Sequence, residues 1–208
     1  MTTPTVLTGT DVRAWVTAFA AAVAEHHHVL TEADRLAGDG DYGDNLRAAL
    51  RRVAVALEES GATDPAGVLT AVSQGFLGTG GTSGPLFGMW FRELARAVGE
   101  ELSTAQLAVG ACRAVATVQR LGHAEVGHKT MVDAMAPAAA ALEQAAADGV
   151  DPAAALALAG SAARAGAEST RELLARRGRA SYVGQRAVGV VDPGAVTVAL
   201  FFEAGAAA

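Results

Sequence analysis

The segment from Gly38 to Asn45 reads Gly-Asp-Gly-Asp-Tyr-Gly-Asp-Asn, and Asp34 lies just upstream of it. Carboxylates this close together repel one another and tolerate desolvation badly unless something positive compensates them. The glycines between them let the backbone fold tightly, so that several carboxylates can converge on one point. Converging oxygen ligands suit Mg²⁺ or Ca²⁺, and Mg²⁺ usually shares its coordination shell with substrate phosphates. The segment therefore predicts a metal site, and more specifically a metal–phosphate site.

Other irregular stretches hold residues that suit phosphate. The run Gly80–Gly84 stands immediately before an expected helix, where free backbone N–H groups and the helix dipole favour anions. Lys129 and Thr130 offer a cation and a hydroxyl at another helix start, while Arg179 and Arg186 could bind phosphate oxygens in a bidentate way. Taken singly, each pattern has a plainer alternative: a flexible glycine connector, a solvated lysine beside an N-cap threonine, or surface arginines.

The composition favours a helical domain. At 208 residues the chain fits one domain, 1–208, that is large enough to bury a sizeable core. Hydrophobic residues make up 51% of the chain but aromatic residues only 5%, which favours closely packed helices over a β-sandwich. The net charge is −6 and there is no run of Lys or Arg, so nucleic acid is not an expected partner.

Several features bear on the compartment. The single cysteine, Cys112, lies in an apolar stretch and is expected to be a buried small hydrophobe rather than a nucleophile. One cysteine forms no disulfide within a chain, which fits a reducing compartment. The N-terminus lacks a signal-peptide pattern, and no uninterrupted apolar run reaches about 18 residues. We therefore expect a soluble, cytoplasmic protein that does not enter a membrane.

Capping residues and hydrophobic spacing predict about eight helices and no convincing strand, with 188–191 the best strand candidate. The expected helices cover about 10–28, 44–60, 65–77, 85–98, 104–121, 130–147, 152–177 and 193 onward. The loops at 34–45, 78–84, 122–130 and 178–192 follow the first, third, fifth and seventh of these helices. With up-and-down connectivity, all four loops gather at one end of the bundle and form one composite site.

With these residues in hand, the chain resembles the nucleotide-binding subunit or domain of dihydroxyacetone kinases, the DhaL or Dak2 family. Four motifs carry the resemblance, in order along nearly the whole chain: the acidic segment 34–45, the glycine-serine loop 80–88, the Lys-Thr-Met helix start 129–133, and the C-terminal stretch from 178–182 to 192–195. Two positions depart from the family pattern. Tyr42 stands where a histidine is common, and His128 stands where an aspartate is common.

The resemblance implies an all-α, eight-helix antiparallel barrel-like bundle with a nucleotide pocket at one end. It implies two Mg²⁺ ions that bridge the phosphates of ADP or ATP and are held by Asp34, Asp39 and Asp41. Arg179 would neutralise phosphate charge as the catalytic group. The other residues expected to contact the nucleotide are Tyr42, Asn45, Gly81, Thr82, Ser83, Leu86, Thr130, Met131, Asp192, Pro193 and Gly194.

The implied activity is transfer of a phosphoryl group from the bound nucleotide to a small ketone or polyol, which a separate ketone-binding kinase subunit holds. In one branch of the family a phosphotransferase-system protein recharges bound ADP, and in the other ATP is the donor. Two alternatives stay open. The chain could be a non-catalytic, nucleotide-loaded module that signals to a regulatory partner, or a helical scaffold whose acidic loop binds only Mg²⁺ or Ca²⁺.

Overall fold

The structure, a computed structural model, describes residues 6–81 and 83–208. Within these ranges the chain is all α-helical, as predicted, and the one β contact is an isolated bridge between Leu7 and Leu102. The α-helices are α1 (Gly9–Ala37), α2 (Tyr42–Ser60), α3 (Pro65–Leu77), α4 (Ser83–Arg96), α5 (Thr104–Gly122), α6 (Val132–Ala147), α7 (Pro152–Ser169), α8 (Ala180–Val183) and α9 (Pro193–Ala207). Two 3₁₀ turns, Thr170–Glu172 and Gly184–Ala187, flank the segment that contains α8.

Local sequence sets the helix starts. Thr8 and Asp11 form a reciprocal capping box at the start of α1. Asp64, Asp151 and Asp192 cap α3, α7 and α9, and a proline follows each of them. Proline suits the first helical position because its missing N–H would have no partner there. The predicted starts of α3, α7 and α9 are therefore confirmed, whereas α1 begins at Gly9, with Thr8 as its cap.

The first helix is longer than predicted. It continues past residue 28 to Ala37, so Asp34 lies on the helix rather than in the loop that follows. Leu30, Ala33 and Ala37 are buried and extend the apolar stripe at helical spacing. The polar histidine triplet at 26–28 interrupts that stripe in the sequence but does not end the helix.

The C-terminal third also departs from the prediction. Helix α7 ends at Ser169, not near residue 177, because the chain tightens into the 3₁₀ turn and Leu173 is then extended. The best strand candidate, Val188–Val191, forms no strand: Gly189 donates its backbone N–H to the carbonyl of Arg171. The stretch expected to be irregular contains α8 and a second 3₁₀ turn.

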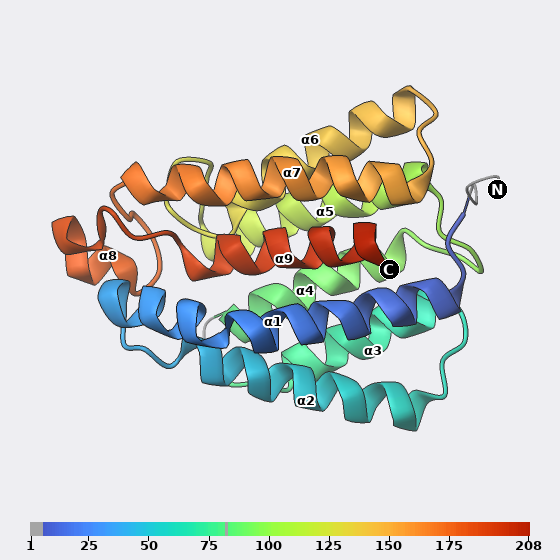
Figure 1. Cartoon of the computed structure of the whole chain (residues 1–208), viewed down its shortest axis with the longest axis horizontal. Helices are drawn as coiled ribbons and strands as arrows, with labels where there is room; N and C mark the ends of the chain where they lie inside the picture. Colours follow the sequence, from blue (N-terminus) through green and yellow to red (C-terminus); the bar gives the residue numbers. More distant parts are fainter. Residues whose placement is uncertain (1–5, 82) are drawn as a thin grey trace.

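Each long helix contacts the next along the chain, and α9 contacts both α7 and α1, so the helices form a closed succession of neighbours (Figure 1). Helix α9 is buried along most of its length. The ring of Phe201 stacks on Trp15 at a centroid distance of 4.3 Å and meets Trp90 and Phe91 edge-on at 5.0 Å. The indole N–H of Trp15 donates to the carbonyl of Phe201 at 2.6 Å. Trp15, Trp90 and Phe91 are therefore part of the core.

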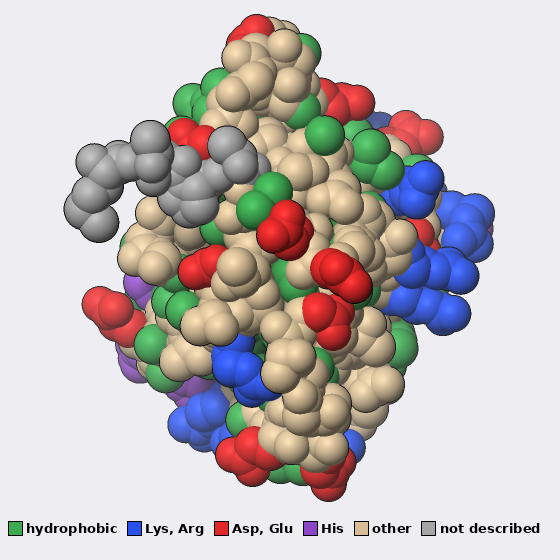
Figure 2. Space-filling view, turned by 90° about the vertical axis from the view of Figure 1, so that its right-hand side faces the viewer, with side chains coloured by type: hydrophobic (Ala, Val, Ile, Leu, Met, Phe, Trp, Pro, Cys, Tyr) green, Lys and Arg blue, Asp and Glu red, His purple; other side chains and the backbone are tan. Residues whose placement is uncertain are grey.

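The two ends of the bundle differ. The chain enters α1 at the end of the molecule that Figure 2 shows face on, where acidic side chains are spread over the surface and hydrophobic ones are scattered among polar groups. The four motif-bearing connections lie at the other end (Figure 1). No helix in the described ranges has an apolar stretch that could span a bilayer.

Glycine permits the close approach of α7 to α6. A Cβ atom added at Gly166 would lie 2.2 Å from the carbonyl oxygen of Asp133 and 2.9 Å from Pro137. We expect Gly166→Ala to lower the free energy of unfolding by about 1–3 kcal/mol, because the two backbones would have to separate. Urea unfolding measures this loss. Gly122→Ala in α5 is the control, since its Cβ would meet neighbours only at 3.8 Å and more; an equal loss in both variants would contradict the packing argument.

Candidate functional site

A cavity of about 200 Å³ opens at the end of the bundle that carries the four motifs. The expected site residues that line it are Asp34, Asp41, Tyr42, Asn45, Gly81, Ser83, Leu86, Thr130, Met131, Arg179, Asp192, Pro193 and Gly194. Asp39 lies outside the lining but belongs to the cluster of acids beside it. Thr82 falls outside the described residues. Segments that are far apart in the sequence therefore meet in one pocket.

Sequence reasoning found Leu86, Met131 and Pro193 but missed the rest of the apolar wall of this pocket. Phe87, Val118 and Ala124 line it, together with the polar residues above. Phe87 and Val118 are almost fully buried and sit at helical spacing with other core residues, so the sequence alone assigns them to the core. The one sequence signal for a role in the pocket is that Phe87 and Val118 lie close to the ends of α4 and α5 that adjoin the motifs.

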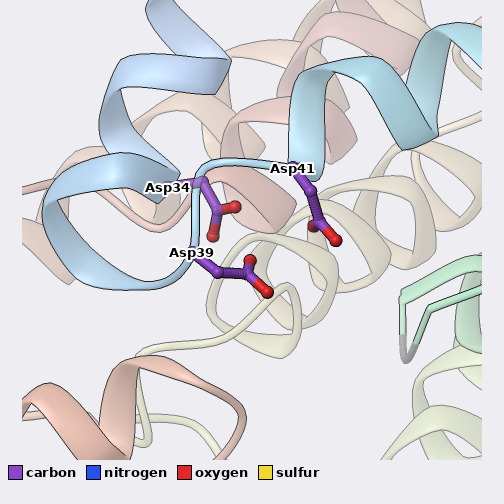
Figure 3. A group of neighbouring side chains, drawn as sticks. All are labelled: Asp34, Asp39 and Asp41. Carbon is purple, nitrogen blue, oxygen red and sulfur yellow. The ribbon is translucent and has the colours of Figure 1, made fainter.

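The three acids converge from three kinds of local structure (Figure 3). Asp34 projects from the last turns of α1, Asp39 from the connecting loop, and Asp41 from the N-cap position of α2. One oxygen of each lies within 4.8 Å of the others. The loop can be this tight because Gly40 has a left-handed φ of 80° and a Cβ at Gly38 would lie 2.5 Å from a carboxylate oxygen of Asp34.

The charges in this cluster are only partly compensated. Burial raises the pKa of Asp34, and the neighbouring Asp39 and Asp41 add to that rise, although the backbone N–H of Tyr42 donates to Asp34 at 3.1 Å. Desolvation acts against ionisation of Asp39 as well, but hydrogen bonding and the charge of Arg179 outweigh it and lower the pKa of Asp39. When all are ionised, three carboxylates face one guanidinium, and an oxygen-only donor set with this negative excess fits Mg²⁺ or Ca²⁺.

The hydroxyl of Tyr42 is directed at α9. It lies 2.8 Å from the hydroxyl of Thr197, which donates its own hydrogen to the carbonyl of Pro193 at 2.9 Å. Tyr42 is therefore the donor in the first of these bonds. Burial raises the pKa of the Tyr42 hydroxyl, so it remains protonated. The side chain ties the start of α2 to the N-terminal part of α9, and Tyr42 also lines the pocket.

Lys129 is buried, so the alternative of a solvated lysine beside an N-cap threonine is wrong. Its side chain is 1% exposed, and its ammonium donates to the carbonyl oxygens of Thr170 and Val190. Desolvation lowers its pKa, while the charges of Asp192 and Asp133 favour the protonated form. Lys129 lines the pocket and joins three segments there, and its hydrogen bonds go to the backbone of this chain.

Two further carboxylates shape the pocket wall. The buried Asp133 accepts hydrogen bonds from the backbone N–H groups of Gly127 and Thr130, which fixes the loop before α6. Asp192 accepts from the N–H of Ala195 at 2.7 Å and caps α9. Burial raises the pKa of Asp192 to about 7, with the charges of Asp133 and Asp34 acting in the same direction.

Two charged residues from the predicted motifs stand apart from the acidic cluster. Asp44 is turned toward His27 at 3.0 Å and Arg47 at 2.9 Å. Arg186 is exposed on the second 3₁₀ turn and makes no described ion pair with Asp39 or Asp41. Among the described residues, the histidine triplet belongs to no group with the spacing of a metal site.

Comparisons with known proteins found one family over most of the chain. The family model described as the DAK2 domain matches residues 36–207. A relative named "PEP-dependent dihydroxyacetone kinase 1, ADP-binding subunit DhaL" from Listeria innocua is 34% identical over 196 residues, covering 91% of each chain. The corresponding ADP-binding subunit from Escherichia coli is 33% identical over 200 residues, covering 95% of each chain.

Longer relatives contain a similar region. The L-erythrulose 1-kinase of Mycolicibacterium smegmatis is 36% identical over 194 residues, which cover 89% of this chain but 33% of that protein. Among solved structures, the dihydroxyacetone kinase from C. freundii in complex with AMP-PNP and Mg²⁺ matches with a TM-score of 0.68 and 26% identity. That match covers 93% of this chain and 33% of the other.

The raised pKa of Asp192 predicts a pH-dependent stability. Between about pH 4 and pH 7 the folded state holds a proton that the unfolded chain, with a pKa of about 3.9, releases. The contribution of Asp192 to the free energy of unfolding therefore falls as the pH rises through this window. Asp192→Asn keeps a capping residue and removes the titration. Urea unfolding with EDTA measures the free energy of unfolding of both proteins. The value for Asp192→Asn should rise relative to that of the wild type from pH 4 to pH 7. A difference between the two that does not change with pH would contradict the raised pKa of Asp192.

Proposed function

The chain belongs to the DAK2 domain family, and from that premise we propose that it is the nucleotide- and magnesium-binding subunit of a dihydroxyacetone-type kinase. The observation that carries the proposal is the convergence of Asp34, Asp39 and Asp41 at a pocket that is also lined by residues of the three other motifs. The pocket combines ligands for a divalent cation, donors for phosphate and an apolar wall.

The polar side of the pocket suits the phosphates. Gly81 lies just before α4 and Ser83 is its first residue, so the free N–H groups and the dipole of that helix favour an anion there. Asn45 and Thr130 supply side-chain groups from α2 and the loop before α6. Bound Mg²⁺, with two ions implied, would neutralise phosphate charge, and the three aspartates would hold it.

The apolar side suits the base of the nucleotide. Leu86, Phe87 and Val118 form one part of it, and Met131 and Pro193 form another. Pockets for small molecules commonly pair such surfaces with a few placed polar groups. The names of the relatives support ADP or ATP as the ligand, since they include ADP-binding subunits and a kinase complexed with AMP-PNP and Mg²⁺.

Phosphoryl transfer in such a site rests on positioning and charge neutralisation rather than on covalent chemistry by the protein. The chain would hold the nucleotide by its phosphates. Arg179, which lines the pocket, would be the catalytic group, because its positive charge would neutralise the phosphates. The acceptor would be a small ketone or polyol that a separate subunit holds. A phosphoprotein of the phosphotransferase system would recharge bound ADP, or ATP would be the donor.

The surface at the pocket end supports a protein partner. Seven large hydrophobic side chains are exposed on the elements and connections at this end: Leu36, Leu77, Leu121, Val126, Leu174, Tyr182 and Val188. Tyr182 is 90% exposed and Val126 is 61% exposed. Exposed apolar side chains that gather around a site are typical of protein interfaces. We assign this surface to the ketone-binding subunit, whose docking would bring the acceptor to the nucleotide.

Thermal unfolding with ADP or ATP, each with Mg²⁺ or EDTA, tests nucleotide binding. A ligand at 100 times its dissociation constant adds about 2.7 kcal/mol to the stability, so the midpoint should rise with nucleotide and Mg²⁺ together. Asp39→Asn should abolish this rise with little effect on the ligand-free fold, because Arg179 already compensates part of the repulsion. Asp44→Asn changes an acid of the same motif that lies outside the cluster and should keep the rise.

No midpoint shift in the folded wild type would favour the metal-only scaffold. A shift that survives in Asp39→Asn but is lost in Asp44→Asn would contradict the assignment of the metal ligands.

Reconstitution tests the catalytic part of the proposal. We expect no transfer to dihydroxyacetone by this chain alone, and transfer when a ketone-binding subunit and a phosphoryl donor are added. Formation of the phosphorylated ketone is the readout. Mg²⁺-dependent nucleotide binding without turnover in any such mixture would favour the non-catalytic signalling module.

A further inference from the structure

One nitrogen of Arg179 bridges two of the three acids. Its Nη1 donates to Asp39 Oδ2 and to Asp41 Oδ1, the latter at 2.9 Å. A cation that used these two oxygens to bind both carboxylates would lie between them. The guanidinium and a metal ion would therefore compete for the same pair of carboxylates.

The segment that carries Arg179 is lightly attached to the rest of the protein. Helix α8 begins at the next residue, packs against α1 and the following 3₁₀ turn, and contains no buried residue. Gly178 and Gly184 flank the helix with φ values of 67° and 64°, in the left-handed region that glycine enters at no steric cost. The ion pairs with Asp39 and Asp41 therefore form a principal tie between α8 and the acidic loop.

A guanidinium and Mg²⁺ are poor neighbours on these carboxylates. Mg²⁺ requires oxygen ligands at about 2.0–2.1 Å in near-octahedral geometry, and a cation already bonded to the same oxygens repels it. Both Arg179 and its partners are about half exposed, and ion pairs at exposed positions are weak. A dication that also gains Asp34 as a ligand can therefore displace the guanidinium.

We propose that Arg179 is the built-in counter-cation of the acidic cluster: it competes with Mg²⁺ for Asp39 and Asp41, and metal binding releases it together with α8. This inference rests on the proposed function for the identity of the metal. It gives Arg179 two opposite effects. Before nucleotide binds, the side chain opposes metal entry. Once released from the acids, the side chain is free to pair with the phosphates, because its segment already lines the pocket.

The test compares Mn²⁺ binding in the absence of nucleotide, followed by the electron paramagnetic resonance signal of free Mn²⁺. Arg179→Gln should bind Mn²⁺ roughly three- to tenfold more tightly than the wild type, the order of effect that two exposed ion pairs supply. Arg179→Lys, which keeps the charge but loses the planar fork, should fall between the two. With ADP present the order should reverse, and Arg179→Gln should hold the Mn²⁺–ADP complex less tightly.

Arg186→Gln is the matched control, because it removes the same charge from the same segment without touching the acids. It should leave Mn²⁺ affinity close to that of the wild type. Unchanged or weaker binding by Arg179→Gln would overturn the competition. An equal gain in Mn²⁺ affinity in Arg186→Gln would also overturn it, because that result would indicate a general effect of charge. The absence of Mn²⁺ binding in all the proteins would overturn it as well.

Hydrogen exchange tests the release of the segment. Backbone amides in 178–188 of the wild type should exchange faster when Mn²⁺ is added, and those of Arg179→Gln should already exchange fast without it. Exchange that Mn²⁺ leaves unchanged in the wild type would overturn the release. Both experiments can be read without nucleotide, so a protein that fails to bind ADP would contradict the proposed function while the competition between Arg179 and the metal is still decided.

Discussion

The mutual repulsion of three convergent carboxylates is the constraint on which the pocket end of this protein depends. Asp34, Asp39 and Asp41 can share one point only because glycines close the loop between them and because Arg179 supplies a positive charge. The rest of the pocket is arranged around this point. The start of α4 and the cap of α9 present backbone groups, and an apolar wall separates them from the core.

Much of this arrangement was predictable because its signals are local. Aspartate followed by proline marks the starts of α3, α7 and α9, and each helix begins there. In an up-and-down bundle, every second connection lies at the same end. The order of the helices alone therefore predicts that the acidic loop and the three other motifs meet at one end. The length of α1 was missed because three consecutive histidines look like an exposed helix end, whereas buried residues resume two positions later.

The parts that could not be predicted depend on contacts between distant segments. Nothing in the sequence around Lys129 distinguishes a solvated ammonium from one that is buried against the carbonyls of Thr170 and Val190, which are 41 and 61 positions away. The same holds for Tyr42, whose hydroxyl partner Thr197 lies 155 positions away. In both cases the residue type was noticed, but the direction of the side chain is decided by which helices become neighbours.

The direction of α9 has a consequence for attachment. The helix starts at the pocket with Pro193 and runs away from it for 15 residues, which is about 22 Å at 1.5 Å per residue. A tether that leaves its far end needs about seven extended residues merely to return to the level of the mouth. A shorter tag or surface linker joined there cannot reach the site, so protein immobilised through that end keeps its pocket accessible from solution.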